Sequence, residues 1–305
     1  MNILIIGTGA VGSFYGSLLA RTGARVSVMA RSDHAVIQEH GIEIHSDTPL
    51  GTYHFHPAAV LRMGELPDEM PDYVLLCIKV TEEANRVALL RPVLGRQTRI
   101  VLISNGVEIE DEIHQAFPDQ PLISGLAFIC VTRTAPGKIW HQSQGRLVLG
   151  DYPCGISEET RLLVEAYQRA GISCHASSDI TTARWQKCLW NAAFNPVSVL
   201  SGGLDTARIL HSQEPFIRAI MEEICQIAAA CGHPLDTDLV SKMIDNTRTM
   251  PPYKTSMLHD FEAGRPLETE AIIGNAVRAA RKAAVSAPRL ESLYALIKLK
   301  EQAGV

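Results

Sequence analysis

The chain has 305 residues and a mass of 33.3 kDa, enough for about two domains of roughly 150 residues each. Hydrophobic residues make up 46% and charged residues 20%, a composition typical of soluble globular proteins that excludes a disordered chain and a collagen-like fibre. The formal net charge is -5 and no Lys/Arg run is present, so we expect neither a nucleic-acid-binding protein nor a membrane-surface anchor.

Cysteine usage and the amino-terminal segment indicate a reducing compartment. The seven cysteines contain no C-x-x-C spacing, which argues against a disulfide framework and a zinc ribbon. The apolar run Ile3–Ile6 has no cationic segment before it, and no stretch approaches the roughly 18 apolar residues of a membrane span. We therefore expect a soluble, cytoplasmic protein.

The first half of the chain alternates short apolar runs with amphipathic stretches. Five runs predict buried strands: Ile3–Ile6, Arg25–Met29, Tyr73–Ile78, Ile100–Ile103 and Leu122–Ala127. A helical pattern separates the first two runs, so βαβ units and a parallel Rossmann-type sheet are expected. Later patterns predict antiparallel strands at Lys138–His141 and Arg146–Leu149, a helix at Ser157–Gly171 and one more strand at Ile172–His175.

The second half has a different texture from about Asp179. Strand patterns are absent, and helical patterns cover Thr181–Leu200, Glu214–Cys231, Thr237–Asn246 and Glu268–Val285. We expect an α/β dinucleotide-binding domain over residues 1–178 and an all-α substrate domain over residues 179–305. The functional site is expected in the cleft between them.

A glycine-rich motif follows the first predicted strand and opens the first predicted helix. It reads Gly7-Thr8-Gly9-Ala10-Val11-Gly12, the G-x-G-x-x-G pattern of dinucleotide-binding domains. The glycines permit a tight turn, close approach to a diphosphate and close packing of helix on strand, and the helix N-terminus favours the anion. This context predicts a dinucleotide cofactor.

The end of the second predicted strand indicates which cofactor is bound. NAD-preferring sites place an acidic residue here to bind the ribose 2′-hydroxyl, but the strand ends Met29-Ala30-Arg31-Ser32. Arg31 can pair with a 2′-phosphate and stack on adenine, which indicates NADP(H). A solvated loop arginine is the alternative.

Two other predicted strands end in polar residues that suit a ligand site. Lys79 follows Ile78, and Ser104-Asn105-Gly106 follows Ile103. Ligands bind at the carboxyl ends of open parallel sheets, so Lys79 and Asn105 are candidate cofactor or substrate contacts. A solvated lysine and a turn asparagine are the alternatives.

The predicted helix Thr181–Leu200 carries a polar stripe. Lys187, Asn191 and Asn195 are spaced i, i+4 and i+8, so they share one helix face, while the rest of the stretch is apolar or aromatic. Buried Lys and Asn side chains are costly without partners, and a ligand would supply them. The alternative is a snorkelling lysine with asparagines bonded to backbone.

Two other features are interpreted as structural. His54 and His56 are spaced like metal ligands on one strand face, but no third ligand is evident, so we expect an exposed edge strand and no metal site. Cys188 projects away from Lys187 around the helix and is expected to be an inert buried thiol.

Taken together, the motifs resemble the ketopantoate (2-dehydropantoate) reductase family over essentially the whole chain. They are the G-x-G-x-x-G start, Arg31, Ser104-Asn105-Gly106, the K-x-x-x-N-x-x-x-N-P helix, Thr255-Ser256-Met257-Leu258-His259-Asp260, and Gly264-Arg265-Pro266-Leu267-Glu268. The resemblance implies NADPH-dependent reduction of 2-dehydropantoate or a related 2-keto acid in pantothenate and coenzyme A biosynthesis. It also implies a helical carboxy-terminal domain like that of 6-phosphogluconate dehydrogenase, in a monomer or homodimer.

The resemblance also implies roles for individual residues. Lys187 matches the family's general acid, and Asn191 and Asn195 match its substrate-binding asparagines. Ser256 matches a serine that holds the substrate carboxylate, and Glu268 an acid beside cofactor and substrate. Two further residues match positions near the cofactor: Asn105, by the nicotinamide ribose and substrate, and Lys79.

Four sites depart from the family pattern. Thr255 replaces the first serine of a usual pair, and Tyr253-Lys254 stands where asparagine is often found. Asp205 stands where a third substrate asparagine is common, and the stretch after Glu268 is Thr-Glu rather than Ile-Asp. Because these departures surround the substrate, they question which 2-keto acid is reduced more than the reaction type.

The chemistry of ketone reduction is consistent with these roles. Hydride transfer develops negative charge on the ketone oxygen, and a lysine can stabilise that charge and then donate a proton. Two alternatives remain open: a β-hydroxyacid-type NADP-dependent dehydrogenase and a non-catalytic NADP-binding sensor. The stretch from Ser256 to Glu268 argues against the first, and the polar stripe at Lys187 against the second.

Overall fold

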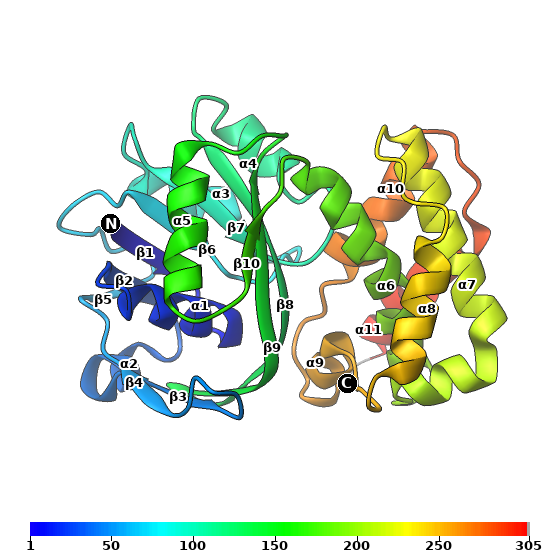
Figure 1. The fold of residues 1–305 in the computed structure, drawn as a ribbon, viewed down its shortest axis with the longest axis horizontal. Helices are drawn as coiled ribbons and strands as arrows, with labels where there is room; N and C mark the ends of the chain where they lie inside the picture. Colours follow the sequence, from blue (N-terminus) through cyan, green and yellow to red (C-terminus); the bar gives the residue numbers. More distant parts are fainter. Residues whose placement is uncertain (304–305) are drawn as a thin grey trace. The chain divides into compact units, whose positions relative to one another are not determined.

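The computed structural model describes residues 1–303, which fold into two compact units (Figure 1). The first unit comprises Met1–Lys79, Ala84–Ser104 and Glu110–Ile180. The second unit comprises Thr181–Val305 together with two short segments from the first half of the chain, Val80–Glu83 and Asn105–Ile109. A single boundary near residue 178 would assign both of these short segments to the first unit.

Within the described residues, the first unit contains one sheet of ten strands. They are β1 (Asn2–Ile6), β2 (Arg25–Ala30), β3 (Ile42–Ser46), β4 (Tyr53–Phe55), β5 (Val60–Arg62), β6 (Tyr73–Leu76), β7 (Arg99–Ile103), β8 (Leu122–Ala135), β9 (Lys138–Asp151) and β10 (Cys174–Ala176). The order is β4-β3-β9-β8-β7-β6-β1-β2-β5, with β10 beside β9. The six strands from β5 to β8 are all parallel, in the spatial order of the Rossmann fold, so the predicted Rossmann-type sheet is confirmed.

Alternate residues of the central strand β1 face opposite cores. Ile3 and Ile5 pack with α1 (Ala10–Ala20) and α5 (Glu158–Arg169), whereas Leu4 and Ile6 lie in a separate cluster with residues of α3 (Arg86–Leu90) and α4 (Asp111–Ala116). Burial on both faces explains why the parallel strands have continuous apolar sequences. A short helix, α2 (His34–His40), follows β2.

The structure corrects the prediction of two short strands after Pro136-Gly137. Lys138–His141 and Arg146–Leu149 are parts of the single strand β9, which pairs antiparallel with a β8 that extends to Ala135. Ile129 pairs with Gln144 and Phe128 with Arg146, so Gly145 between them forms a β-bulge. The bulge interrupts the alternating pattern, which explains why the sequence suggests a strand break. The expected edge strand at His54 is confirmed, because β4 lies at one end of the sheet.

The second unit is helical. Its helices are α6 (Ile180–Leu200), α7 (Thr206–Ala230), α8 (Leu239–Thr249), α9 (Ser256–Glu262), α10 (Asn275–Lys282) and α11 (Pro288–Gln302), with a π-helical turn at Glu270–Gly274 before α10. The first residue of α6, Ile180, is the last residue of the first unit. Among the described residues, no helix is both long enough and apolar enough to cross a membrane.

The helical predictions agree with the structure in one case and differ in another. In α7, a kink at Gln213, two residues before Pro215, separates a first helical stretch from Thr206 and a second one that begins at Glu214, as predicted. Proline has no N–H for the helical ladder and restricts the residue before it, which explains the distortion. The helix predicted at Glu268–Val285 contains the π-helical turn and ends at Lys282.

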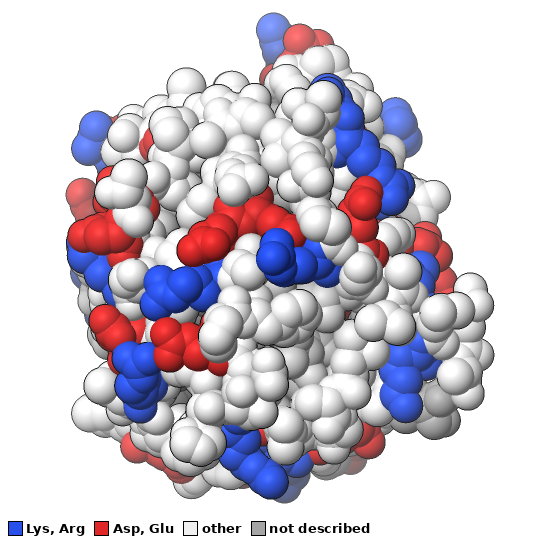
Figure 2. Space-filling view, turned by 90° about the vertical axis from the view of Figure 1, so that its right-hand side faces the viewer, with Lys and Arg blue, Asp and Glu red and all other residues white. Residues whose placement is uncertain are grey.

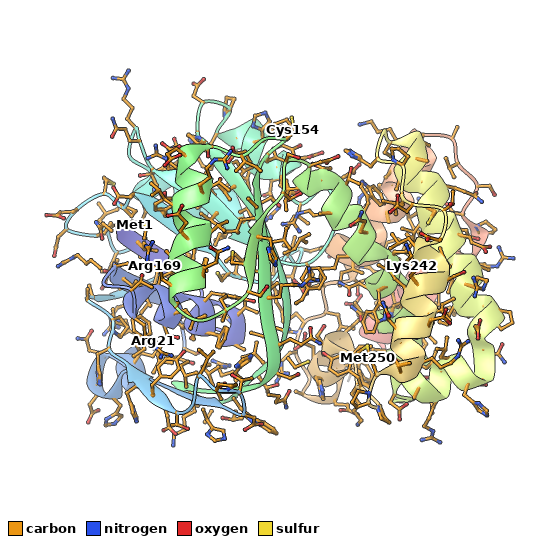
Figure 3. All side chains as sticks on the ribbon, in the orientation of Figure 1. Met1, Arg21, Cys154, Arg169, Lys242 and Met250 are labelled. Carbon is orange, nitrogen blue, oxygen red and sulfur yellow. The ribbon has the colours of Figure 1, made fainter. Side chains whose placement is uncertain are left out.

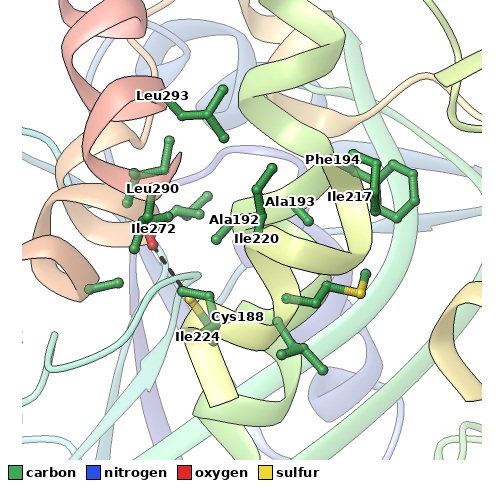
Figure 4. Packing of buried hydrophobic residues seen from close by; sticks show 14 of the residues in the cluster. Cys188, Ala192, Ala193, Phe194, Ile217, Ile220, Ile224, Ile272, Leu290 and Leu293 are labelled. Carbon is green, nitrogen blue, oxygen red and sulfur yellow. Dashed lines mark hydrogen bonds between the residues drawn. The ribbon is translucent and has the colours of Figure 1, made fainter. Parts of the chain in front are cut away.

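The core of the helical unit surrounds α6 (Figure 4). Ala192 and Ala193 have small side chains that admit neighbours from α7 and α11, among them Ile220 and Leu290. Cys188 is buried here and its Sγ lies 3.4 Å from the carbonyl oxygen of Ile272, as Figure 4 shows. The prediction that this thiol is buried is confirmed, and burial raises its pKa to about 12, which disfavours the reactive thiolate.

Charges of both signs are interspersed on the face shown in Figure 2. On α7 and α8, Glu214 pairs with Arg218 at 3.2 Å and with Arg248 at 2.6 Å, and Lys242 pairs with Asp238 at 2.6 Å. Such exposed pairs contribute little to stability but keep apolar patches small.

A histidine is buried in the core of the first unit. The His141 side chain is fully buried against the Phe14 ring, with ring centroids 4.3 Å apart, and its Nδ1 lies 2.8 Å from Ser46 Oγ. Burial lowers the pKa of His141, because the protonated ring loses its hydration.

We predict that His141 makes the protein less stable in acid. Its pKa is about 6.5 in the unfolded chain and lower in the folded one, so below that pH the unfolded state binds the proton first. The free energy of unfolding should therefore decrease as the pH is lowered, by up to about 1.4 kcal/mol for each pH unit. Urea denaturation measures the free energy of unfolding of the wild type and of His141→Phe. The difference between these two free energies should change with pH below about pH 6.5. A constant difference would contradict the prediction.

Candidate active site

The glycine-rich turn of the first unit joins β1 to α1. A Cβ on Gly12 would lie 2.1 Å from the carbonyl oxygen of Gly7, so no larger residue fits. A Cβ on Gly9 would meet nothing within 4 Å, and Gly9 is the N-cap of α1 without a side-chain hydrogen bond. The first turn of α1 therefore faces open space with backbone N–H groups that no side chain caps, an arrangement that fits a dinucleotide diphosphate.

The chain after β2 has an exposed arginine and a buried aspartate. Arg31 directly follows the last residue of β2 and is exposed. Asp33 is buried, and its two carboxylate oxygens accept hydrogen bonds from Arg133 Nη1 at 2.6 and 2.8 Å. Since Arg133 engages this carboxylate, the exposed charge at the end of β2 is positive.

The strand preceding Lys79 is shorter than predicted. β6 ends at Leu76 rather than Ile78, so Lys79 lies three residues beyond the strand. Lys79 is the last residue of Met1–Lys79, the first segment of the first unit. The carbonyl oxygen of Ile78 accepts a hydrogen bond of 3.1 Å from Ser104 Oγ, which links the segments following β6 and β7.

In the helical unit, α6 carries the predicted polar stripe. Lys187 is half-buried, and Asn191 and Asn195 are buried. Asn195 is only 1% exposed, and neither its Oδ1 nor its Nδ2 has a hydrogen-bond partner. An unsatisfied buried amide costs about 1–3 kcal/mol, and a bound polar molecule would remove that cost.

Three of the predicted site residues form a hydrogen-bonded chain. Lys187 Nζ donates to Asn105 Oδ1 at 2.9 Å, and Asn105 Nδ2 donates to Glu268 Oε2 at 2.9 Å. The Glu268 carboxylate is buried, at the approach to the π-helical turn. The amide thus joins an ammonium to a carboxylate, a contact that the sequence did not reveal.

The segment carrying Asn105 is anchored to the helical unit by its backbone. Val107 N–H donates to the Ala271 carbonyl oxygen at 3.1 Å, Arg184 Nη1 to the Gly106 carbonyl oxygen at 3.1 Å, and Asn275 Nδ2 to the Val107 carbonyl oxygen at 2.7 Å. Sequence reasoning missed Arg184 and Asn275. Arg184 lies three residues before Lys187 on the same helix, so the polar stripe could have been extended to it.

Hydroxyl groups connect α9 to α6. Thr255 is the N-cap of α9 and accepts a hydrogen bond from Leu258 N–H, while its Oγ1 lies 2.5 Å from Ser198 Oγ. Ser198 Oγ in turn donates to the carbonyl oxygen of Asn195 at 2.9 Å. Ser256 is exposed in the first turn of α9. The departure from serine at Thr255 therefore retains a capping hydroxyl.

Asp205 also has a structural contact that accounts for an acid at this position. It is the N-cap of α7, and its Oδ1 accepts a 2.8 Å hydrogen bond from the Arg208 N–H. Aspartate is among the preferred N-cap residues because its carboxylate satisfies free N–H groups at the positive end of the helix.

The site residues of the helical unit can polarise a carbonyl group. Lys187 has an ammonium group that can donate hydrogen bonds, and Asn195 has an amide that can donate to one ligand atom and accept from another. The first unit offers an uncapped helix N-terminus and the exposed Arg31.

Comparisons with known proteins cover nearly the whole chain. Residues 3–153 match the family model described as "Ketopantoate reductase PanE/ApbA", and residues 179–301 match "Ketopantoate reductase PanE/ApbA C terminal". The crystal structure of 2-dehydropantoate 2-reductase from Methylococcus capsulatus is 61% identical in sequence, has a TM-score of 0.95, and the match covers 99% of this chain and 97% of that one.

Two further relatives define the range of similarity. The 2-dehydropantoate 2-reductase of Nostoc sp. is 30% identical over an alignment of 302 positions, and the match covers 96% of this chain and 93% of that protein. A D-mandelate dehydrogenase solved with NADH and anilino(oxo)acetate is 22% identical with a TM-score of 0.89, and the match covers 99% of each chain. At that identity the likeness shows a shared fold.

We predict that Gly106→Ala destabilises the helical unit. Gly106 has φ +107°, and a Cβ would lie 2.4 Å from the Ala271 carbonyl oxygen, so the variant has both backbone strain and overlap. Gly202→Ala is the matched control, because Gly202 has φ +77° but nothing within 4 Å of its Cβ position. Overlap typically costs about 1–3 kcal/mol beyond the strain. The thermal midpoint of Gly106→Ala should lie below that of Gly202→Ala; equal midpoints would contradict the close approach.

Proposed function

The chain belongs to the ketopantoate reductase PanE/ApbA family, and we propose that it is an NADPH-dependent 2-dehydropantoate 2-reductase acting in pantothenate biosynthesis. It would reduce the ketone of 2-dehydropantoate to the hydroxyl of pantoate. The observation that carries the proposal is the hydrogen-bonded chain from Lys187 through Asn105 to Glu268. The unpartnered Asn195 amide, on the same helix as Lys187, supports it.

Residues of the first unit would bind the cofactor. The diphosphate would lie on the turn Gly7-Thr8-Gly9-Ala10-Val11-Gly12, where nothing caps the first N–H groups of α1. Arg31 would pair with the 2′-phosphate, and the nearby acid Asp33 is held by Arg133 and does not repel it. Lys79 is a further proposed cofactor contact. These features favour NADPH over NADH.

The helical unit would supply proton transfer. NADPH, when bound, supplies the hydride. Lys187 would stabilise the negative charge that develops on the ketone oxygen and then donate its proton to that oxygen. Asn105 holds the ammonium by its Oδ1 and is itself held by Glu268, so the lysine is oriented before the substrate arrives.

Three further side chains would bind the substrate. Asn191 and Asn195 lie one and two helix turns beyond Lys187, where their amides can bind hydroxyl and carbonyl oxygens. Ser256, exposed at the start of α9, would donate a hydrogen bond from its hydroxyl to the substrate carboxylate.

The direct test is NADPH consumption with a panel of 2-keto acids and NADP+ reduction with 3-hydroxy acids. Turnover of 2-dehydropantoate with much weaker turnover of the others supports the proposal. Preference for a 3-hydroxy acid would assign a β-hydroxyacid dehydrogenase, and cofactor binding without turnover would assign a sensor.

We predict that Arg31→Ala weakens NADPH binding far more than NADH binding, because only NADPH carries the 2′-phosphate. A charge-assisted hydrogen bond is worth about 1.5–3 kcal/mol, so the dissociation constant for NADPH should rise by roughly 10- to 150-fold. Nicotinamide fluorescence titrations measure both constants. Arg161→Ala, at an exposed arginine on α5, is the control and should bind both cofactors normally. Equal affinity of the unmodified protein for NADPH and NADH would contradict the prediction.

We predict that Lys187→Ala reduces kcat by roughly 10²–10⁴-fold, the usual contribution of a positioned acid. NADPH affinity should remain nearly unchanged, because the proposed phosphate contacts lie in the first unit. The unmodified enzyme should lose activity as pH rises through the pKa of this lysine, and the variant should lack that alkaline decline. If the variant keeps normal turnover, Lys187 is not the proton donor.

A further inference from the structure

Segment Val80–Glu83 belongs to the helical unit although it directly follows Lys79 of the first unit. An ion pair anchors it there, because Lys298 Nζ on α11 lies 3.0 Å from Glu82 Oε1. The side chain of Glu82 is 69% exposed, and its carboxylate is directed to Lys298 by this ion pair.

The same lysine reaches a second carboxylate. Lys298 Nζ lies 3.1 Å from Glu270 Oε1, which also accepts a 2.8 Å hydrogen bond from the Tyr294 hydroxyl, and Glu270 Oε2 accepts one of 2.7 Å from Arg278. Glu270 is 17% exposed and Lys298 31% exposed, so this part of the network is shielded from solvent. Lys298 is therefore a bridge between two segments and not one member of an isolated surface pair.

The charges of this bridge persist around neutral pH. Burial lowers the pKa of Lys298, but its hydrogen bonds to Glu82 and Glu270 outweigh burial and raise it above the ordinary value. Burial raises the pKa of Glu270, but hydrogen bonds from Arg278, Tyr294 and Lys298 outweigh burial and lower it.

Glu270 begins the π-helical turn two residues after Glu268. Its carboxylate folds over Gly274, where a Cβ would lie 2.4 Å from Glu270 Oε2, so a larger residue at 274 would displace it. The next residue, Ala271, accepts the hydrogen bond from Val107 N–H that anchors the Asn105 segment. The bridge of Lys298 thus joins the segment after Lys79 to the turn that holds Glu268 and Asn105.

We propose that Lys298 is a positioning residue for NADPH binding, which acts by holding Glu82 and Glu270 so that the segment Val80–Glu83 and the Glu268 turn keep the arrangement the cofactor needs. This inference rests on the proposed function, because it takes Lys79 and Glu268 as cofactor contacts. Lys298 itself donates to the two carboxylates, so its removal alters where other residues lie.

The test compares Lys298→Met with Lys298→Arg and with Lys242→Met as a matched control. Lys242, labelled in Figure 3, also pairs with a carboxylate, Asp238, but on the exposed face of α8. NADPH dissociation constants come from nicotinamide fluorescence, followed by KM, kcat and thermal midpoints.

We expect Lys298→Met to raise the NADPH dissociation constant about five-fold at low salt, the factor that corresponds to about 1 kcal/mol. The kcat should change less than the NADPH affinity, because Lys187, Asn105 and Glu268 all remain and keep their own hydrogen bonds. Lys298→Arg should restore most of the affinity, and Lys242→Met should bind NADPH as wild type does. The ratio of Lys298→Met to wild type should fall toward one in high salt, since screening weakens the pairs in the wild type.

A second variant protects the test against unfolding. Glu82→Gln removes the exposed partner with little risk to the fold, and it should weaken NADPH binding without adding to the effect of Lys298→Met. Unchanged affinity in Glu82→Gln and Lys298→Met overturns the inference, as does an equal loss in Lys242→Met. Fluorescence measures NADPH binding without turnover. A protein that binds NADPH but does not reduce 2-dehydropantoate would therefore contradict the proposed function, while the NADPH dissociation constants of the variants would still decide the inference on Lys298.

Discussion

The candidate site depends on the close approach of the Gly106 backbone to the Ala271 carbonyl group. A Cβ at Gly106 would lie 2.4 Å from that oxygen, so only glycine lets the segment lie against the helical unit. This approach places the amide of Asn105 between Lys187, 82 positions away in sequence, and Glu268, 163 positions away. Glu268 is buried and the other two side chains are half-buried, so the chain of hydrogen bonds offsets part of the cost of removing their polar groups from water.

The two units differ in what they would contribute to a reaction. In the first, the backbone N–H groups at the start of α1 and the exposed side chain of Arg31 are positively polarised or charged groups that suit phosphates. In the second, the ammonium group of Lys187 and the amide groups of the two asparagines lie on α6. The other faces of α6 pack into the core through Ala192, Ala193 and Phe194. A rigid helix holds such groups more precisely than a loop does, which favours preorganised polarisation of a carbonyl group.

Two departures from the family pattern coincide with helix caps. Asp205 caps α7 and Thr255 caps α9, where Thr255 also contacts Ser198 beneath Asn195. A cap must have an oxygen that accepts from a free N–H, a condition that aspartate and threonine both meet. The constraint at these two positions is therefore local, and it acts on the substrate side chains only through the placement of α9 and of Asn195.

The sequence by itself determined the elements whose signals are local. The glycine motif, the continuous apolar strands and the i, i+4, i+8 stripe on α6 depend on periodicity and on residues close in the chain, so the Rossmann-type sheet and the polar helix could be predicted. The tertiary structure alone decided which segments meet. The bulge at Gly145 that merges two predicted strands into β9, the π-helical turn after Glu268, and the transfer of Val80–Glu83 and Asn105–Ile109 to the helical unit all depend on partners far away in sequence. The same holds for Arg184, Asn275 and Lys298, whose roles come from the oxygens they reach, because a charged or amide side chain has the same local signature whether it binds solvent or a distant backbone carbonyl.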